Sequence, residues 1–167
     1  PHTNEVRSGQ VEAGQGFSYW LLKFDGVSGS RDRGQLLNDP AGYGLIEYAY
    51  YQMAQRAGIQ MVPCRLLQEH GRSHFMTRRF DRDDQGRKRH MLSLGAMRHF
   101  DYRQPGAYSY EQALHTIREL GMGMDSIEEQ FRRMAFNIIA RNQDDHVKNI
   151  AFLMNQGGHW SLAPAYD

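Results

Sequence analysis

The sequence has a single cysteine, Cys64, among its 167 residues, so it cannot form an intramolecular disulfide, and it contains no Cys/His zinc motif. It also lacks any apolar run approaching the roughly 18 residues that a membrane-spanning helix requires. Residues 1–10 are polar and lack the hydrophobic core of a secretory signal peptide. These absences predict a protein of the reducing cytoplasm that does not bind membranes.

Net charge is also nearly absent, because 20 basic and 19 acidic side chains leave a formal charge of +1. The net charge therefore gives no reason to expect nonspecific binding to nucleic acids. Any binding of phosphate groups must depend on a few charged side chains at one site. Lysine is scarce, and occurs only as Lys23, Lys88 and Lys148. The remaining composition, with 40% hydrophobic residues, is that of an ordinary globular protein, and the length suits one compact domain or two lobes sharing a cleft.

The first part of the chain is predicted to contain a strand followed by a helix. Residues 17–24 are rich in aromatic side chains, which favours a mostly buried strand that carries Lys23. Residues 42–57 place apolar side chains at three-to-four spacing before Gly58, which predicts an amphipathic helix with Glu47 in its first or second turn. The apolar positions of this helix are Leu45, Ile46, Ala49, Met53, Ala54 and Ala57.

Turns and charged segments are predicted from composition. Residues 26–34 are rich in Gly, Arg and Asp and are interpreted as a loop. Apolar runs at 61–67 and 74–80 flank a glycine and predict a β-hairpin. The charged segment 81–90 is expected to face solvent and to mark a boundary between lobes.

The last part of the chain shows helical periodicity and then a second hairpin. Helices are predicted over 110–120 and over 127–140, the latter apolar on a broad face and capped by Asp125 or Ser126. A polar loop follows, and residues 150–167 are predicted to form the hairpin. The seven histidines other than His146 show no metal-ligand spacing and are interpreted as structural or surface groups.

The polar loop at residues 142–149 is the strongest functional signal, because it is wedged between two apolar segments. Asp144 and Asn149 are five residues apart, the separation at which a catalytic loop offers a carboxylate to a substrate hydroxyl and an amide oxygen to a metal. Asp167, at the end of the following hairpin, would be the second metal ligand. Asp145 is interpreted as structural, in a turn or cap.

The chemistry of phosphoryl transfer explains this choice of side chains. Mg²⁺ prefers hard oxygen ligands and keeps several waters, so one Asp and one Asn suffice beside the phosphates of a nucleotide. Asp144 would act as the base toward the acceptor hydroxyl, and Lys23 would place a cation on the phosphates, held by Glu47. Lys148 would add a second cation where charge develops.

Four stretches resemble, in order, the kinase portion of the HipA family, bacterial toxin serine/threonine protein kinases. They are WLLKF at 20–24, GLIEYAYYQMAQRAGI at 44–59, FMTRRFDR at 75–82, and RNQDDHVKNIAFL at 141–153 followed by LAPAYD at 162–167. The resemblance covers nearly the whole chain. Its most specific part is the D-x-H-x-x-N loop followed by a hairpin that ends in Tyr-Asp.

The resemblance implies a role for each matching residue. Asp144 is then the catalytic aspartate, Asn149 and Asp167 coordinate Mg²⁺, and Lys23 touches the ATP phosphates. His146 shapes the loop or lies near the phosphates. The backbone of the hinge segment faces the adenine, and its residues are Thr77, Arg78, Arg79 and Phe80. At position 78 the family often has an acidic residue, so an adenine contact through that side chain departs from the pattern.

The resemblance also implies an α+β, two-lobed fold similar to protein kinases and phosphoinositide kinases, here truncated at both ends. Residues 1–81 would belong to the smaller lobe, with the hinge near 77–80. Residues 82–167 would belong to the larger, helical lobe, with the catalytic loop at 142–149 and the metal-binding hairpin at 150–167. The family's Gly-rich loop is expected before Pro1, so the ATP affinity of this segment alone should be weak.

The implied function is ATP- and Mg²⁺-dependent phosphorylation of Ser or Thr in a protein substrate, by a toxin of a toxin–antitoxin system. A DNA-binding antitoxin is the implied partner, and a translation protein such as an aminoacyl-tRNA synthetase is a candidate target. Two alternatives stay open. A metal-dependent phosphohydrolase would need further His or Asp ligands around Asp144 and Asp145, and a noncatalytic pseudokinase would keep the fold without turnover.

Overall fold

The computed structural model describes residues 6–9, 16–26, 42–83, 85–101, 103, 106 and 108–167, so most of the loop predicted at 26–34 lies outside the described residues. The strands are β1 (Trp20–Lys23), β2 (Cys64–Glu69), β3 (Arg72–Arg78), β4 (His90–Ser93), β5 (Ala151–Met154) and β6 (Trp160–Leu162). The helices are α1 (Tyr43–Arg56), α2 (Leu94–Arg98), α3 (Tyr110–Glu119) and α4 (Met124–Ile139).

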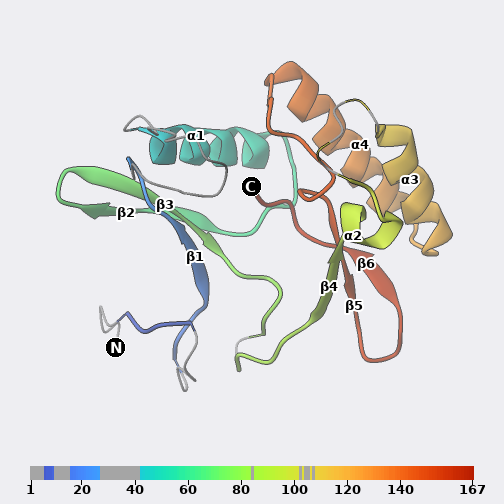
Figure 1. The fold of residues 1–167 in the computed structure, drawn as a ribbon, viewed down its shortest axis with the longest axis horizontal. Helices are drawn as coiled ribbons and strands as arrows, with labels where there is room; N and C mark the ends of the chain where they lie inside the picture. The colour runs from blue at the N-terminus through green and yellow to red at the C-terminus, as the bar shows by residue number, and fades with distance from the viewer. Residues whose placement is uncertain are drawn as a thin grey trace.

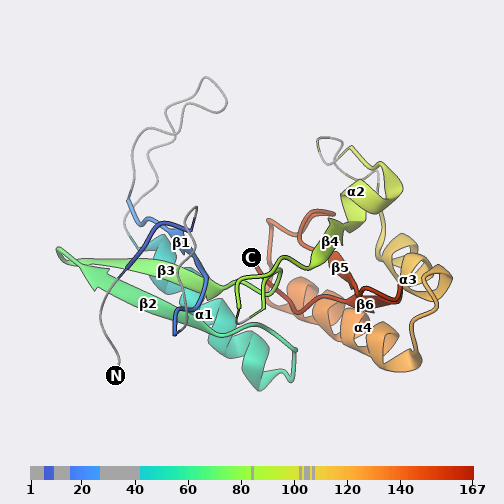
Figure 2. The same ribbon diagram turned by 90° about the horizontal axis from the view of Figure 1, so that it is seen from below.

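The strands form two separate antiparallel sheets, ordered β1-β3-β2 and β4-β5-β6. In Figure 1 the first sheet lies with α1 on one side of the molecule, and the second sheet lies with α2, α3 and α4 on the other. The view in Figure 2 shows the same separation, with the C-terminus between the two parts. The fold is therefore a mixed α and β arrangement built around two small sheets.

The hairpin of β2 and β3 confirms the predicted turn at a glycine. His70 and Gly71 connect the strands with φ values of 49° and 73°. Two consecutive residues with positive φ form the type of two-residue turn that matches the right-handed twist of paired strands. The strands extend further into the turn than the apolar runs predicted, because cross-strand pairing continues to Glu69 and Arg72.

Helix α1 approaches the first sheet closely at Gly44, which has no Cβ atom. A Cβ atom added at Gly44 would lie 2.0 Å from the carbonyl oxygen of Ser73 in β3, so only glycine permits this approach. The buried residues of α1 are Gly44, Tyr51 and Ala54. The predicted helix is confirmed, but of its predicted apolar positions only Ala54 is buried, and Leu45 and Ile46 are 51% and 53% exposed.

Strand β1 is shorter and more exposed than predicted. It is one of the two edge strands of the described first sheet. Inward and outward positions alternate along it, and Leu21 is 52% exposed. The aromatic-rich sequence therefore indicated the strand correctly but overestimated its burial, since an edge strand has a neighbour on one side only.

The second core lies between the other sheet and the helices. Its buried residues are Leu94, Ala113, Ile117, Val147, Ile150 and Phe152. Helix α3 begins with a capping box in which Ser109 accepts from Gln112 N–H and Gln112 accepts from Ser109 N–H. The charged segment 81–90 ends at the start of β4, an element that the sequence analysis did not predict, and α2 follows it directly.

Helix α4 begins earlier than predicted, with Gly123 as its N-cap, so the expected cap at Asp125 or Ser126 is wrong and Asp125 lies in the first turn. Its buried side chains are polar: Glu129, Gln130 and Arg133. The expected broad apolar face is only partly buried, since Ile139 is 81% exposed. Among the residues that the structure describes, no helix has the length and apolarity to cross a membrane.

Candidate active site

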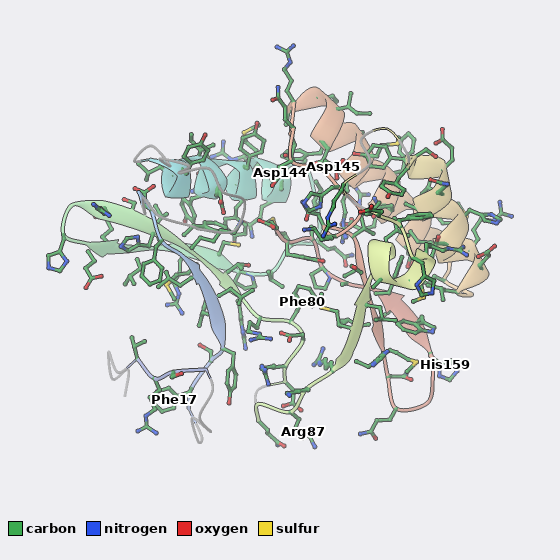
Figure 3. All side chains as sticks on the ribbon, viewed as in Figure 1. Phe17, Phe80, Arg87, Asp144, Asp145 and His159 are labelled. Carbon is green, nitrogen blue, oxygen red and sulfur yellow. The ribbon has the colours of Figure 1, made fainter. Side chains whose placement is uncertain are left out.

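A cleft of about 460 Å³ lies where the two parts of the molecule meet, and its walls come from β1, α1, α4, the polar loop and the C-terminal segment. In Figure 3 Asp144 and Asp145 lie between α1 on one side and α3 and α4 on the other. The cleft brings together five residues that the sequence analysis named for function, and these are Lys23, Glu47, Asp144, Asn149 and Asp167.

Lys23 is one of three cationic residues, with Arg133 and Arg141, that line the cleft in the described part of the chain. Its Nζ lies 3.3 Å from Oε1 and 3.2 Å from Oε2 of Glu47, and it also pairs with the carboxylate of Asp167. Burial is the largest influence on the pKa of Lys23 and opposes the charged form, but Asp167 and Glu47 together outweigh it and raise the pKa. The ammonium is therefore charged at neutral pH.

Glu47 lies in an environment with an excess of negative charge. Burial is the largest cause of its raised pKa, and the charges of Asp167 and Asp144 add to it while Lys23 opposes it. The pKa of Glu47 therefore rises chiefly because its side chain is buried, whereas the pKa of Lys23 rises because two carboxylates face its ammonium and outweigh burial. An additional cation in the cleft would relieve the repulsion among these carboxylates.

Asp25, two residues after Lys23, is a positioning residue that the sequence analysis missed. Its carboxylate accepts hydrogen bonds from Gly42 N–H at 2.9 and 3.1 Å and from Gly44 N–H at 3.4 Å, so it caps α1 from outside the helix. Its own N–H donates to Nδ1 of the buried His74 at 2.9 Å. Because Asp25 joins β1 to the start of α1, it holds Glu47 opposite Lys23.

The polar loop is shaped by its own side chains. Asp144 N–H donates to Oδ1 of Asn142 at 3.1 Å, and Nδ2 of Asn149 donates to the Asp144 carbonyl at 2.8 Å. Asn149 N–H donates to the His146 carbonyl at 2.8 Å. The Asp144 side chain is 86% exposed, with His146 Nε2 3.9 Å from its Oδ1. The loop thus presents Asp144 to solvent at the cleft.

Asp145 also lines the cleft but is engaged by another element. The hydroxyl of Tyr110, the first residue of α3, donates to its carboxylate. Burial raises the pKa of Asp145, and the charge of His146 opposes this shift. This partner agrees with the interpretation of Asp145 as structural.

The oxygens available in the cleft fit a hard divalent cation. Nδ2 of Asn149 is used by the Asp144 carbonyl, so Oδ1 is the atom that remains for a metal, and Asp167 contributes a carboxylate. The shared negative charge around Lys23 also favours a cation. Within the described ranges no three His, Cys, Asp or Glu side chains form a metal-binding group by themselves. A metal here would therefore depend on ligand oxygens from a bound phosphate.

Six further residues named from the sequence are outside the set that lines the cleft, and these are Thr77, Arg78, Arg79, Phe80, His146 and Lys148. Thr77 is buried and accepts from Sγ of Cys64. Arg79 forms an ion pair with Asp81. The Phe80 ring lies 5.1 Å from that of Tyr166, a cleft residue. The roles expected of these six residues stay predictions.

Known proteins with similar sequence or structure agree with this architecture. Residues 3–167 match the family model described as HipA-like C-terminal domain. A Haemophilus influenzae protein named "Putative kinase" is 35% identical over 108 residues, which cover 60% of this chain and 32% of that protein. The fold resembles that of a chain in the Shewanella oneidensis MR-1 toxin–antitoxin complex of HipA, HipB and operator DNA, with a TM-score of 0.61 and 18% identity over 74% of this chain and 33% of that chain. The chain spans about a third of the length of each of these proteins.

Proposed function

Since the chain belongs to the family of HipA-like C-terminal domains, we propose that it carries the nucleotide-binding and catalytic residues of an ATP-dependent protein kinase acting on Ser or Thr. The observation that carries this proposal is the convergence of Lys23, Glu47, Asp144, Asn149 and Asp167 on a single cleft. Phosphoryl transfer needs a cation on the phosphates, oxygens for Mg²⁺ and a base at the acceptor hydroxyl. The cleft offers a residue for each task.

Asp144 is the base in this proposal. Its carboxylate is exposed at the cleft, and its main chain is fixed by Asn142 and Asn149. Asp144 would orient the acceptor hydroxyl and take its proton as the new bond from oxygen to the γ-phosphorus forms and the bond to ADP breaks. A carboxylate on a fixed loop suits this role, because the reacting groups must meet within hydrogen-bond reach.

Lys23 binds the phosphates in this proposal, and Glu47 orients its ammonium through the ion pair. Mg²⁺, held by Asn149 and Asp167, would neutralise charge on the phosphate oxygens. Lys148 would provide a further positive charge near the transferred group, and His146 would shape the loop beside it. The main chain of residues 77–80 would face the adenine.

The domain organisation is part of the same proposal. Residues 1–81, which include the first sheet and α1, would form part of the smaller lobe of a kinase-like fold, with the hinge near 77–80. Residues 82–167 would form part of the larger lobe, with the catalytic loop at 142–149 and the metal-binding hairpin at 150–167. The likeness to the Shewanella HipA chain supports this arrangement at the level of fold.

The biological partners are proposed from the relatives. The similar Shewanella chain is HipA in a complex with HipB and operator DNA. We propose a DNA-binding antitoxin as partner of this protein, and a translation protein such as an aminoacyl-tRNA synthetase as a substrate of its kinase activity. The cytoplasm is the compartment in which such partners would be met.

The test replaces Asp144 by Asn in the full-length protein and measures transfer of the γ-phosphoryl group of ATP with Mg²⁺ present. Loss of the base should lower kcat by roughly 10²- to 10⁴-fold, with an unchanged unfolding temperature. Asp125→Asn, at an exposed position in the first turn of α4, is the matched control and should keep the rate of the unaltered protein. If Asp144→Asn transferred phosphate at the rate of the unaltered protein, Asp144 would not be the catalytic base.

The same assay separates the alternatives. A noncatalytic pseudokinase would transfer no phosphate but would keep its effect on growth in the Asp144→Asn variant. A two-metal phosphohydrolase would release inorganic phosphate from a phosphoester without a nucleotide. It needs several clustered ligands, and the described part of the chain offers no group of three His, Cys, Asp or Glu side chains for that purpose.

A further inference from the structure

Two buried charges of α4 lie on its inward face. Glu129 and Arg133 are only 4% and 8% exposed, and Oε1 of Glu129 lies 2.9 Å from Nε of Arg133. Burying charged groups is costly unless they are paired and hydrogen-bonded. Apolar side chains would fill the same space without this cost, so the pair requires an explanation beyond packing.

Both side chains bind the main chain of one residue outside α4. Oε1 of Glu129 accepts from Gln60 N–H at 3.0 Å, and Nη2 of Arg133 donates to the Gln60 carbonyl at 3.4 Å. Gln60 lies in the connection between α1 and β2. The ion pair therefore holds the end of α1, the helix that carries Glu47, against α4.

The same Gln60 carbonyl also binds the C-terminal segment. Ala165 N–H donates to it at 2.8 Å, and Met61 pairs with Ala165 in a parallel bridge. Ala165 lies two residues before Asp167, whose carboxylate pairs with Lys23. A single residue, Gln60, thus connects the helix of Glu47, the segment of Asp167 and the buried pair of α4.

We propose that Glu129 and Arg133 form a positioning pair that sets the placement of Glu47 and Asp167 around Lys23. This inference rests on the proposed kinase function, because it assigns the pair to the same cleft. Arg133 also lines the cleft, but the role proposed here is exerted through the contacts of the pair with Gln60. Misplacement of a catalytic group by about 1 Å lowers the rate by roughly a hundredfold, so a device that fixes these distances has a measurable effect on turnover.

The test uses the double variant Glu129→Leu with Arg133→Met in the full-length protein. Replacing a buried ion pair by apolar residues of similar volume is often neutral for stability, so this variant should fold. Removal of one partner alone would leave a buried charge unpaired. We expect kcat for phosphoryl transfer to fall roughly ten- to hundredfold, and KM for ATP to rise, because Lys23 and Asp167 bind the nucleotide in the proposed function. Hydrogen exchange of the Gln60 and Ala165 amides should become faster.

Arg132→Met is the matched control. Arg132 also pairs with Glu129, at 2.7 Å, but is 42% exposed, and its loss keeps both contacts of the positioning pair to Gln60. It should retain the kcat of the unaltered protein. A folded double variant with that same kcat would overturn the inference. If the unaltered protein transfers no phosphate, the proposed function fails instead. Amide exchange then tests the inference alone, and unchanged exchange rates of Gln60 and Ala165 in the double variant would overturn it.

Discussion

At the scale of single residues, Lys23 shows how a common side chain acquires a specific role. A lysine in an edge strand is usually a surface residue whose charged end reaches water. Here its partners, Glu47 and Asp167, are 24 and 144 positions away in the chain. Local sequence patterns do not show such distant pairings, so the sequence analysis proposed Lys23 from the chemistry of phosphoryl transfer and from the resemblance to a family.

Tyr166 gives a prediction at this scale. Burial raises its pKa from 10.0 to about 12, with the charge of Asp167 adding to the shift and Arg133 opposing it. Because the folded protein holds this proton more tightly than the unfolded chain, the stabilisation is complete below pH 10 and is lost as the pH rises through 12.

The Tyr166→Phe variant tests this pH dependence. It should be less stable than the unaltered protein by about 1 kcal/mol at pH 8, since the hydroxyl donates to the Lys148 carbonyl. The difference should shrink between pH 10 and 12, because phenylalanine has no proton to lose. Urea unfolding across this range measures the effect, with the exposed Tyr43→Phe as control. A difference that stays constant with pH would contradict the assignment to Tyr166.

At the scale of elements, two contacts from β1 and the residues directly after it hold the start of α1. Lys23 binds Glu47 on the second turn of the helix, and Asp25 caps the N–H groups of Gly42 and Gly44. Gly44 in turn allows the helix to approach β3 closely. The helix is therefore held at its start, where the functional carboxylate lies.

Asp25→Ala tests the external cap. Loss of an N-terminal cap costs about 1–2 kcal/mol, so the free energy of unfolding should fall by this amount in urea titrations. Asp125→Ala removes an exposed carboxylate from the first turn of α4 instead and should cost only a few tenths of a kcal/mol. Equal and small effects of both changes would show that Asp25 does not hold α1.

The sequence analysis predicted the longer helices and both hairpins but missed two short elements, β4 and α2. Helices α1 and α3 and both hairpins follow from apolar spacing and glycine turns, which are local properties. β4 and α2 have only four and five residues, too few for a period to appear, and they follow a charged segment. The face that α1 buries could not be predicted either, because it depends on a contact between Gly44 and Ser73 of another element.

At the scale of the whole molecule, two small sheets with their helices meet at one cleft, and the chain crosses between them at residues 79–89 (Figure 1). Asp144, Asn149 and Asp167 were predictable together because the polar loop and the hairpin that ends in Tyr-Asp form a compound pattern. The positioning pair and Gln60 were not, since each lies in an unremarkable local sequence. The sequence therefore identifies the groups for the proposed chemistry, whereas the fold identifies what holds them.

The central claim is that Lys23 and Asp167 bind a magnesium-bound nucleotide in this cleft, and calorimetric titration of the full-length protein with ATP and Mg²⁺ tests it most directly. Loss of one charge-assisted contact should weaken binding at least about tenfold in Lys23→Met and in Asp167→Asn, while Asp125→Asn binds like the unaltered protein. Unchanged affinity in both cleft variants, or no binding by the unaltered protein, would contradict the claim.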